Sequence, residues 1–243
     1  MTTLFEQPKK PKKTLLFLEI VFLLAGFIAL GWAGYTAGQG YLYNSWQDYK
    51  FEQTLEGEKP SISGYLSYLA NGATRPHDEN EQPAVEAPMP TKPTRKLAPN
   101  ETIGRIEIPR VQVSAVVKEG IDTKTLSRAV GHVPYTALPG QKGNIAVAAH
   151  RDTFFRGLRN IRQGDVIRVV TLDGVYRYQV DAMKIVWPKN VEVLDPTPDP
   201  RLTLVTCYPF NYIGSAPKRF IVSAKQVGYE EASTRTKPAA SGS

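Results

Sequence analysis

The stretch Arg201-Leu-Thr-Leu-Val-Thr-Cys-Tyr-Pro-Phe210 is the part of the sequence around which the fold is organised. Its β-branched and aliphatic residues form a short apolar run, which predicts a buried β-strand. Pro209 has no backbone N–H to donate, so it ends the regular ladder just beyond Cys207. Most free cysteines pack as small apolar groups, but a thiol at the open end of a strand is well placed to face a cleft. The stretch therefore makes Cys207 a candidate nucleophile.

Length, charge and cysteine usage limit the classes of protein that need to be considered. The 243 residues carry a net charge of +7 and include one cysteine, enough chain for one domain of moderate size with appendages. A lone cysteine excludes an intramolecular disulfide and a multi-cysteine zinc site. No basic stripe interleaved with aromatic residues is present, so nucleic-acid binding is not predicted. No cofactor and no metal site is predicted. The acidic residues Glu119, Asp122 and Asp152 are scattered, and their pattern is too generic to indicate a calcium site.

The amino-terminal segment predicts a membrane anchor. Residues 14–38 are almost continuously apolar, with Glu19 near one end, and are long enough to cross a bilayer as a helix. The lysines of residues 1–13 precede this segment, so the positive-inside rule places a basic tail in the cytoplasm and the remaining chain outside. A cleaved signal peptide is the alternative, but the apolar run is longer than the usual core of a signal peptide. We expect a single-pass protein of the cell membrane.

The region 39–101 is predicted to be an extracytoplasmic stalk and Pro-rich linker. Residues 41–56 are expected to form an exposed amphipathic helix. Beyond them, prolines recur among charged and polar residues, a composition that cannot bury enough apolar surface to fold. The segment 229–243 is predicted to be a disordered tail.

The folded domain is predicted at residues 102–228 and is mainly β. Short apolar or alternating runs recur at 103–108, 111–117, 143–149, 166–172, 175–187, 202–206 and 219–224. Asp173-Gly174 predicts a hairpin between two of them. Asp122 is expected to cap a short helix that Gly131 closes, and Asp152 to cap another turn or two through Leu158. About eight short strands with few helices favour a closed or nearly closed β-barrel.

Three residues occupy comparable positions in this predicted barrel. His150 and Cys207 each end an apolar strand, and Arg219 begins another. Strand ends at one rim converge in space, so we expect the three side chains to meet. An imidazole can protonate a leaving group beside a thiol nucleophile, and a guanidinium can stabilise a developing oxyanion.

Several segments resemble the signature segments of sortases, most closely those of class D. They are Gly131-His-Val-Pro-Tyr-Thr-Ala-Leu-Pro-Gly140, Ala148-Ala-His-Arg-Asp-Thr-Phe-Phe-Arg156, Thr203-Leu-Val-Thr-Cys-Tyr-Pro-Phe210 and Pro217-Lys-Arg-Phe-Ile-Val222. The resemblance covers residues 102–228 and implies a closed eight-stranded barrel. His132 lies in one of these segments, but it follows an expected helix end, and we interpret it as structural.

The resemblance also implies an activity and its site residues. It implies a membrane-anchored cysteine transpeptidase that cleaves an LPxTG-like sorting signal after Thr and passes the protein to an amino nucleophile of peptidoglycan or a pilin. Cys207 would be the nucleophile, His150 the general acid and Arg219 the residue that steadies substrate and oxyanion. The product would be a protein anchored to the cell wall or joined to a pilus.

The sequence also bears on two rival functions. An L,D-transpeptidase would carry Arg two residues after its cysteine, and this chain has Pro209 there. A non-enzymatic, anchored β-barrel that binds a partner would bury Cys207 instead of exposing it. Accessibility of the thiol therefore separates this binding module from the enzyme.

Overall fold

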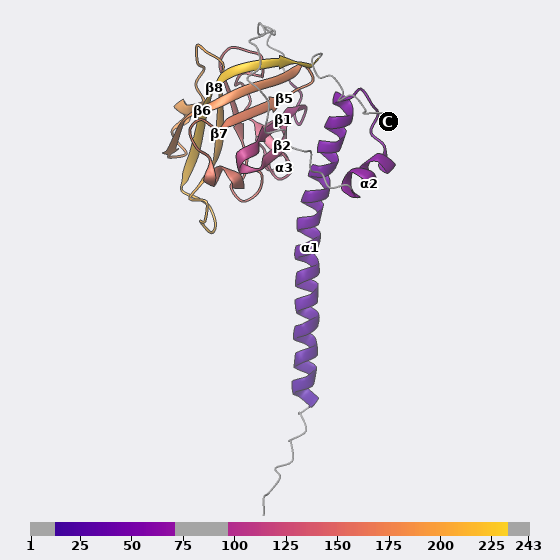
Figure 1. Cartoon of the computed structure of the whole chain (residues 1–243). Helices are drawn as coiled ribbons and strands as arrows, with labels where there is room; N and C mark the ends of the chain where they lie inside the picture. The colour runs from indigo at the N-terminus through magenta and orange to yellow at the C-terminus, as the bar shows by residue number, and fades with distance from the viewer. Residues whose placement is uncertain (1–12, 71–96, 233–243) are drawn as a thin grey trace, which may run out of the picture. The chain divides into compact units, whose positions relative to one another are not determined.

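The computed structural model describes residues 13–70 and 97–232, which divide into two units at the boundary between Leu42 and Tyr43 (Figure 1). Helix α1 (Lys13–Leu55) includes Phe17–Tyr35, a 19-residue span with a mean hydropathy of 2.0. Length and composition make this span able to cross a membrane. The predicted basic tail before residue 13, the linker at 71–96 and the tail at 233–243 lie outside the described residues.

Eight strands close into a barrel in the order β1-β2-β3-β4-β7-β8-β6-β5 (Figure 1). Their bounds are β1 (Thr102–Ile108), β2 (Val113–Glu119), β3 (Val130–His132), β4 (Asn144–Ala148), β5 (Val166–Val170), β6 (Gly174–Val186), β7 (Arg201–Tyr208) and β8 (Lys218–Glu231). Strands β2 and β3 are parallel, as are β4 and β7, and the other neighbours are antiparallel. The closed barrel confirms the predicted fold class.

The remaining elements are short. They are α2 (Ile62–Ala70), η1 (Pro109–Val111), α3 (Thr123–Leu126), η2 (Arg156–Asn160) and η3 (Val191–Leu194). Asp122 caps α3 as predicted and accepts hydrogen bonds from two backbone N–H groups. The expected closure of that helix at Gly131 is wrong, because Gly131 lies inside β3 and its backbone pairs with β2 and β4.

Two other local expectations differ from the structure. Asp152 does not cap η2, which begins at Arg156 after Phe155 and has no side-chain cap. Strand β8 continues to Glu231, beyond the boundary predicted at 228, because Tyr229 is buried and its hydroxyl donates to Asp173 O at 2.8 Å.

The predicted Asp173-Gly174 hairpin is confirmed. Gly174 is required there because its φ is +155° and a Cβ would lie 2.1 Å from Glu230 O.

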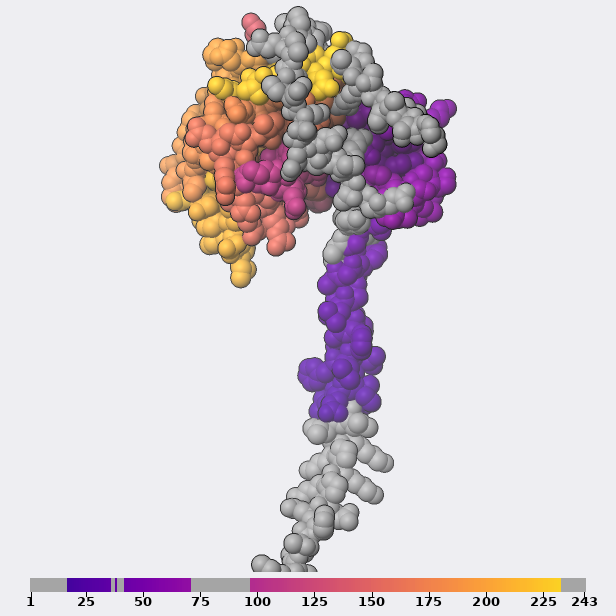
Figure 2. All heavy atoms as spheres, in the orientation of Figure 1, coloured from indigo at the N-terminus to yellow at the C-terminus, as the bar shows by residue number. Residues whose placement is uncertain are grey.

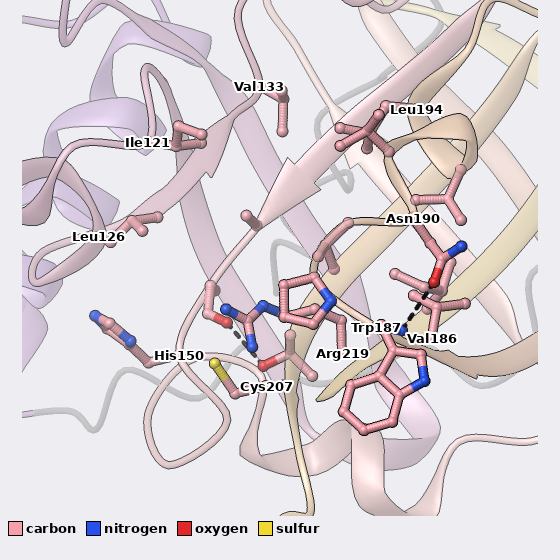
Figure 3. Close-up of a pocket in the computed structure, with 18 residues that line it drawn as sticks. Ile121, Leu126, Val133, His150, Val186, Trp187, Asn190, Leu194, Cys207 and Arg219 are labelled. Carbon is pink, nitrogen blue, oxygen red and sulfur yellow. Dashed lines mark hydrogen bonds between the residues drawn. The ribbon is translucent and has the colours of Figure 1, made fainter. Parts of the chain in front are cut away.

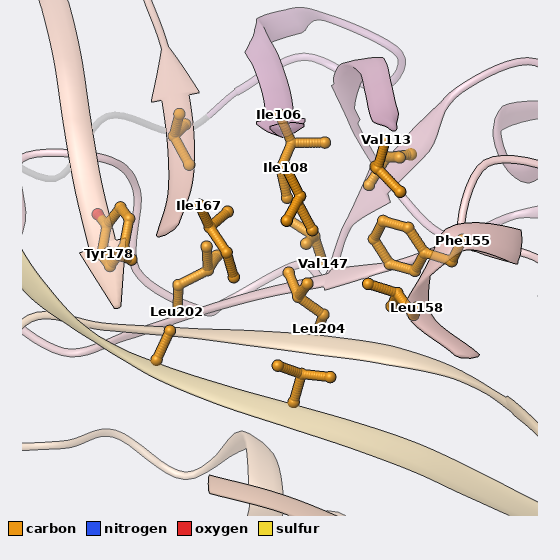
Figure 4. Packing of buried hydrophobic residues seen from close by; sticks show 14 of the residues in the cluster. Ile106, Ile108, Val113, Val147, Phe155, Leu158, Ile167, Tyr178, Leu202 and Leu204 are labelled. Carbon is orange, nitrogen blue, oxygen red and sulfur yellow. The ribbon is translucent and has the colours of Figure 1, made fainter. Parts of the chain in front are cut away.

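One face of each strand fills the barrel. Alternate residues point inward along a strand, so Leu202 and Leu204 of β7 meet Tyr178 of β6 in one continuous core (Figure 4). Phe155 and Leu158, from the segment between β4 and β5, are fully buried in the same core. Because the N–H of Phe155 donates to His150 O at 3.1 Å, burial of the phenyl ring fixes the turn that follows β4.

The carboxyl-terminal part of α1 belongs to the barrel unit. Phe51 is buried with Val170 of β5 and Val175 of β6, and Leu55 packs against them. The adjoining α2 packs on the same part of α1, where Trp46 and Tyr65 meet edge to face at 4.9 Å. The helix predicted at 41–56 is therefore present, but it is not exposed, since the outer faces of β5 and β6 carry apolar side chains that it covers.

A group of charged residues accompanies this apolar contact. Arg105 of β1 is buried and donates to Glu52 Oε1 and Glu107 Oε1, each at 2.9 Å. Its guanidinium also lies 5.8 Å from the centre of the Phe51 ring. Asp48 is the third carboxylate of the group, and burial, opposed by the charge of Arg105, raises its pKa to about 7.

We expect Asp48 to make the barrel unit less stable as pH rises. The pKa of Asp48 in the folded protein lies above its ordinary value of 3.8, so the folded state favours the protonated carboxyl. Its contribution to the free energy of unfolding is therefore fully present below pH 3.8 and is lost as pH rises to about 7. Asp48→Asn should therefore stabilise the protein by about 2–4 kcal/mol at pH 8 and have little effect at pH 4. Thermal unfolding of the full chain in detergent micelles at both pH values measures the difference.

The matched control is Asp199→Asn, which removes an exposed carboxylate elsewhere in the same unit. An equal gain for both variants at pH 8 would contradict the assignment to Asp48.

Candidate active site

Strand β7 carries Cys207 between β8, which bears Arg219, and β4, which ends two residues before His150. Leu202, Leu204 and Thr206 are buried, so the alternation of side chains places Cys207 on the outer face of the sheet. Cys207 is the register partner of Arg219 on β8, and directly opposed residues on antiparallel strands have Cβ atoms about 5 Å apart. The pairing brings the thiol and the guanidinium together, as the sequence predicted.

His150 approaches from the other side of β7. Ala148 is the register partner of Val205 on the parallel pair β4–β7, and His150 lies two residues beyond it. The buried hydroxyl of Thr206 donates to Ala149 O at 2.7 Å, which ties the end of β4 to the residue before Cys207. In Figure 3, Cys207 lies between His150 and Arg219, and the exposed imidazole points away from the sulfur.

The three side chains share a cavity of about 410 Å³. Its floor includes Val205 and Ile221, which are cross-strand partners on the outer face of the sheet. Apolar residues of η3, of the end of β6, and of α3 and the loop before it complete its walls (Figure 3): Ile121, Leu126, Val186, Trp187, Val191, Val193 and Leu194. The cleft predicted for Cys207 is therefore present, but it lies on the outer face of the sheet and extends beyond the strand ends.

Arg219 is held by backbone carbonyls. Its Nη1 donates to Ala216 O at 3.2 Å and to Lys218 O at 3.0 Å, both near the start of β8. Lys218 itself lies over the ring of Trp187, with Nζ 5.0 Å from the ring centre. These contacts fix the backbone around Arg219 and leave the guanidinium beside the cavity.

A buried polar network supports the wall formed by η3. Asn144 at the start of β4 accepts a 2.8 Å hydrogen bond from Thr203 Oγ1 on β7. Its amide nitrogen donates to Val193 O and Asp195 O at 3.1 and 3.3 Å. The network therefore attaches the β6–β7 connection to the same two strands that position His150 and Cys207.

His132 is excluded from the site by its surroundings. It is buried on β3, with Nδ1 2.6 Å from Glu119 Oε2 and Nε2 3.0 Å from Ala137 O. Both ring nitrogens are occupied, in agreement with the structural role predicted for this residue.

No metal centre is present among the described residues, where no cluster of three or more His, Cys, Asp or Glu side chains could hold an ion.

Sequence reasoning did not identify Asn144 or Thr206 as supports of the site. An alternating strand pattern could have indicated that Thr206 points inward, but the partners of Asn144 are more than 45 positions away.

Comparisons with known proteins agree on one family. Residues 106–227 match the family model described as the sortase domain. Sortase D from Bacillus subtilis is 28% identical over 211 residues, which cover 86% of this chain and 98% of the relative.

Solved structures of the same family are also similar. The SrtA sortase from Actinomyces oris aligns with a TM-score of 0.55 and 29% identity over 63% of this chain and 94% of the other. A sortase D5 transpeptidase from Clostridium perfringens aligns with a TM-score of 0.50 and 29% identity over 55% of this chain and 83% of the other.

We expect Asn144→Ala to loosen the η3 wall. Removing the amide leaves two backbone carbonyls and the Thr203 hydroxyl without this partner, which should cost about 1–3 kcal/mol of unfolding free energy. Denaturant unfolding gives that value, and hydrogen–deuterium exchange should become faster at residues 188–196. Asn160→Ala at the exposed end of η2 is the control, and unchanged exchange at the η3 wall would contradict the role of Asn144.

Proposed function

Because this chain belongs to the sortase family of cysteine transpeptidases, we propose that it cleaves an LPxTG-like sorting signal after Thr and transfers the new carboxyl end to an amine. Cys207 is the nucleophile, His150 the general acid and base, and Arg219 the group that stabilises substrate and oxyanion. The observation that carries this assignment is the register pairing of Cys207 with Arg219, with His150 just beyond the β4–β7 pair.

The cavity suits an extended peptide with an aliphatic residue. Its lining is largely aliphatic and includes Val193, Leu194 and Ile221, which can bury a Leu side chain and the ring of a Pro. The thiol lies in the same cavity, and its side chain is partly exposed. A peptide bound along these walls would place its scissile carbonyl at Cys207.

The first half of the reaction forms a thioester. The thiolate of Cys207 attacks the carbonyl carbon of the signal's Thr, and the carbonyl oxygen becomes an oxyanion beside Arg219. The tetrahedral intermediate then collapses, the C–N bond breaks, and protonated His150 gives its proton to the departing amine. Rotation about the Cα–Cβ bond of His150 would turn the imidazole toward the sulfur.

The second half resolves the thioester. An amine from a peptidoglycan cross-bridge or a pilin lysine attacks the acyl carbon, neutral His150 accepts the proton of the incoming amine, and the Cys207 thiolate leaves. A new amide bond forms and both side chains return to their starting protonation states. Because the His150 side chain faces solvent, an incoming amine can reach it.

We further propose that α1 anchors the enzyme in the cell membrane through Phe17–Tyr35, with the amino terminus in the cytoplasm and the barrel outside. The lysines before this span support that orientation. Sorting-signal proteins and amine acceptors would then both be met on the outer side of the membrane.

Cys207→Ala should abolish transfer. Full-length protein in detergent, incubated with a fluorescent LPxTG peptide and an amine, should give the amide product and, without the amine, an acyl-enzyme detected by mass spectrometry. Cys207→Ala should form neither and should retain thermal stability, because only the sulfur is lost from a partly exposed side chain. Full transfer by Cys207→Ala would remove Cys207 from the mechanism, whereas no transfer by the wild-type protein would favour the binding module.

Arg219→Lys should lower kcat by about 10²-fold, because an ammonium cannot reproduce the fork of donors that faces the oxyanion. Steady-state kinetics of peptide cleavage measures this change. Arg162→Lys, an exposed replacement of the same kind, is the control. Equal kcat values for the two variants would remove Arg219 from the mechanism.

A further inference from the structure

Arg151 connects the turn after His150 to the β7–β8 connection. Its Nη2 donates to Tyr212 O at 2.6 Å and to Gly214 O at 3.1 Å. Tyr212 and Gly214 belong to residues 209–217, which join Cys207's strand to Arg219's strand. One guanidinium therefore reaches from the residue next to His150 to the segment between the other two site residues.

Phe210 at the start of the β7–β8 connection packs against Phe220 of β8, but the part beyond it, residues 211–215, has few other means of keeping its shape. It projects from the end of the barrel (Figure 2), and at its tip the Ile213 side chain is 97% exposed. Gly214 has a φ of +90°, a conformation in which other residues are strained. Within the part of the chain that the structure describes, hydrogen bonds that reach residues 211–215 from outside the connection come from Arg151.

The far end of the connection is attached to Arg219. Ala216 O, two residues after Gly214, accepts a hydrogen bond from Arg219 Nη1 at 3.2 Å. A shift of the connection would therefore move one of the two carbonyls that hold Arg219. The path from Arg151 through residues 212–216 to Arg219 runs through backbone groups and does not involve the barrel core.

We propose that Arg151 is a positioning residue that fixes the β7–β8 connection and, through it, the placement of Arg219 relative to His150. The expected effect of Arg151 on the reaction rate rests on the proposed transpeptidase function. Its expected effect on the shape of the connection rests on the hydrogen bonds alone. Arg is suited to this role because its planar guanidinium can serve two carbonyls from one rigid group, whereas the ammonium of Lys is a point donor on a flexible stem. Arg151 does not contact the reacting atoms in this assignment.

The experiment compares Arg151→Gln and Arg151→Lys with Arg156→Gln in the full-length protein in detergent. Arg156 is an exposed arginine of the same segment, so its replacement removes the same charge without removing the two hydrogen bonds. We expect Arg151→Gln to lower kcat about tenfold or more with a smaller change in KM, since a misplaced catalytic group slows the chemical step. Arg151→Lys should retain part of the rate, and Arg156→Gln all of it.

Hydrogen–deuterium exchange without substrate provides a second measurement that is independent of activity. Residues 210–216 should exchange faster in Arg151→Gln than in the wild type or Arg156→Gln, while the barrel strands and the melting temperature stay unchanged. Wild-type kinetics and wild-type exchange in Arg151→Gln would overturn the inference. If the wild-type protein transferred no peptide, the proposed function would fail, and the exchange data would still decide whether Arg151 holds the connection.

Discussion

The double pairing of β7 is the constraint on which the site depends. Its parallel neighbour β4 leads to His150, and its antiparallel neighbour β8 begins with Arg219. Because hydrogen-bond register is fixed along both edges of β7, the backbones of Cys207 and Arg219 are aligned, and His150 follows two residues beyond the paired end of β4. A shift by one residue would turn Cys207 into the core and bring Thr206 to the cavity, and the buried contacts of Leu202 and Leu204 oppose such a shift.

The barrel also depends on a cover supplied by a segment that precedes it. Val170 and Val175 point outward from the sheet, where they would meet water without Phe51 of α1. Arg105 is buried in the same contact and is paired with Glu52 of the helix. A buried cation whose partner is removed is costly, so the helical residues 43–55 are part of the folded unit although the family match begins at residue 106.

The sequence predicted the parts of this structure that depend on local pattern. Apolar alternation located most strands, Asp173-Gly174 located a hairpin, and strand ends next to His150 and Cys207 located the cavity. Strand β3 was not expected, because its three residues are too short for a periodic signal and follow a helical one. The roles of Arg105, Asn144 and Arg151 were also beyond sequence reasoning. These roles rest on Glu52, Val193 and Tyr212, which lie 49 or more positions from their partners, and only the closed topology brings them together.

The site therefore combines two kinds of support. Cys207 lies within a strand that is hydrogen-bonded on both sides, so its position follows the rigid barrel. The segments near it are connections held by a few polar contacts: Asn144 holds the η3 wall, and Arg151 holds the β7–β8 connection beside the site. Connections of this kind can change sequence without disturbing a core. A barrel built in this way can keep the candidate nucleophile in place while the walls around it vary.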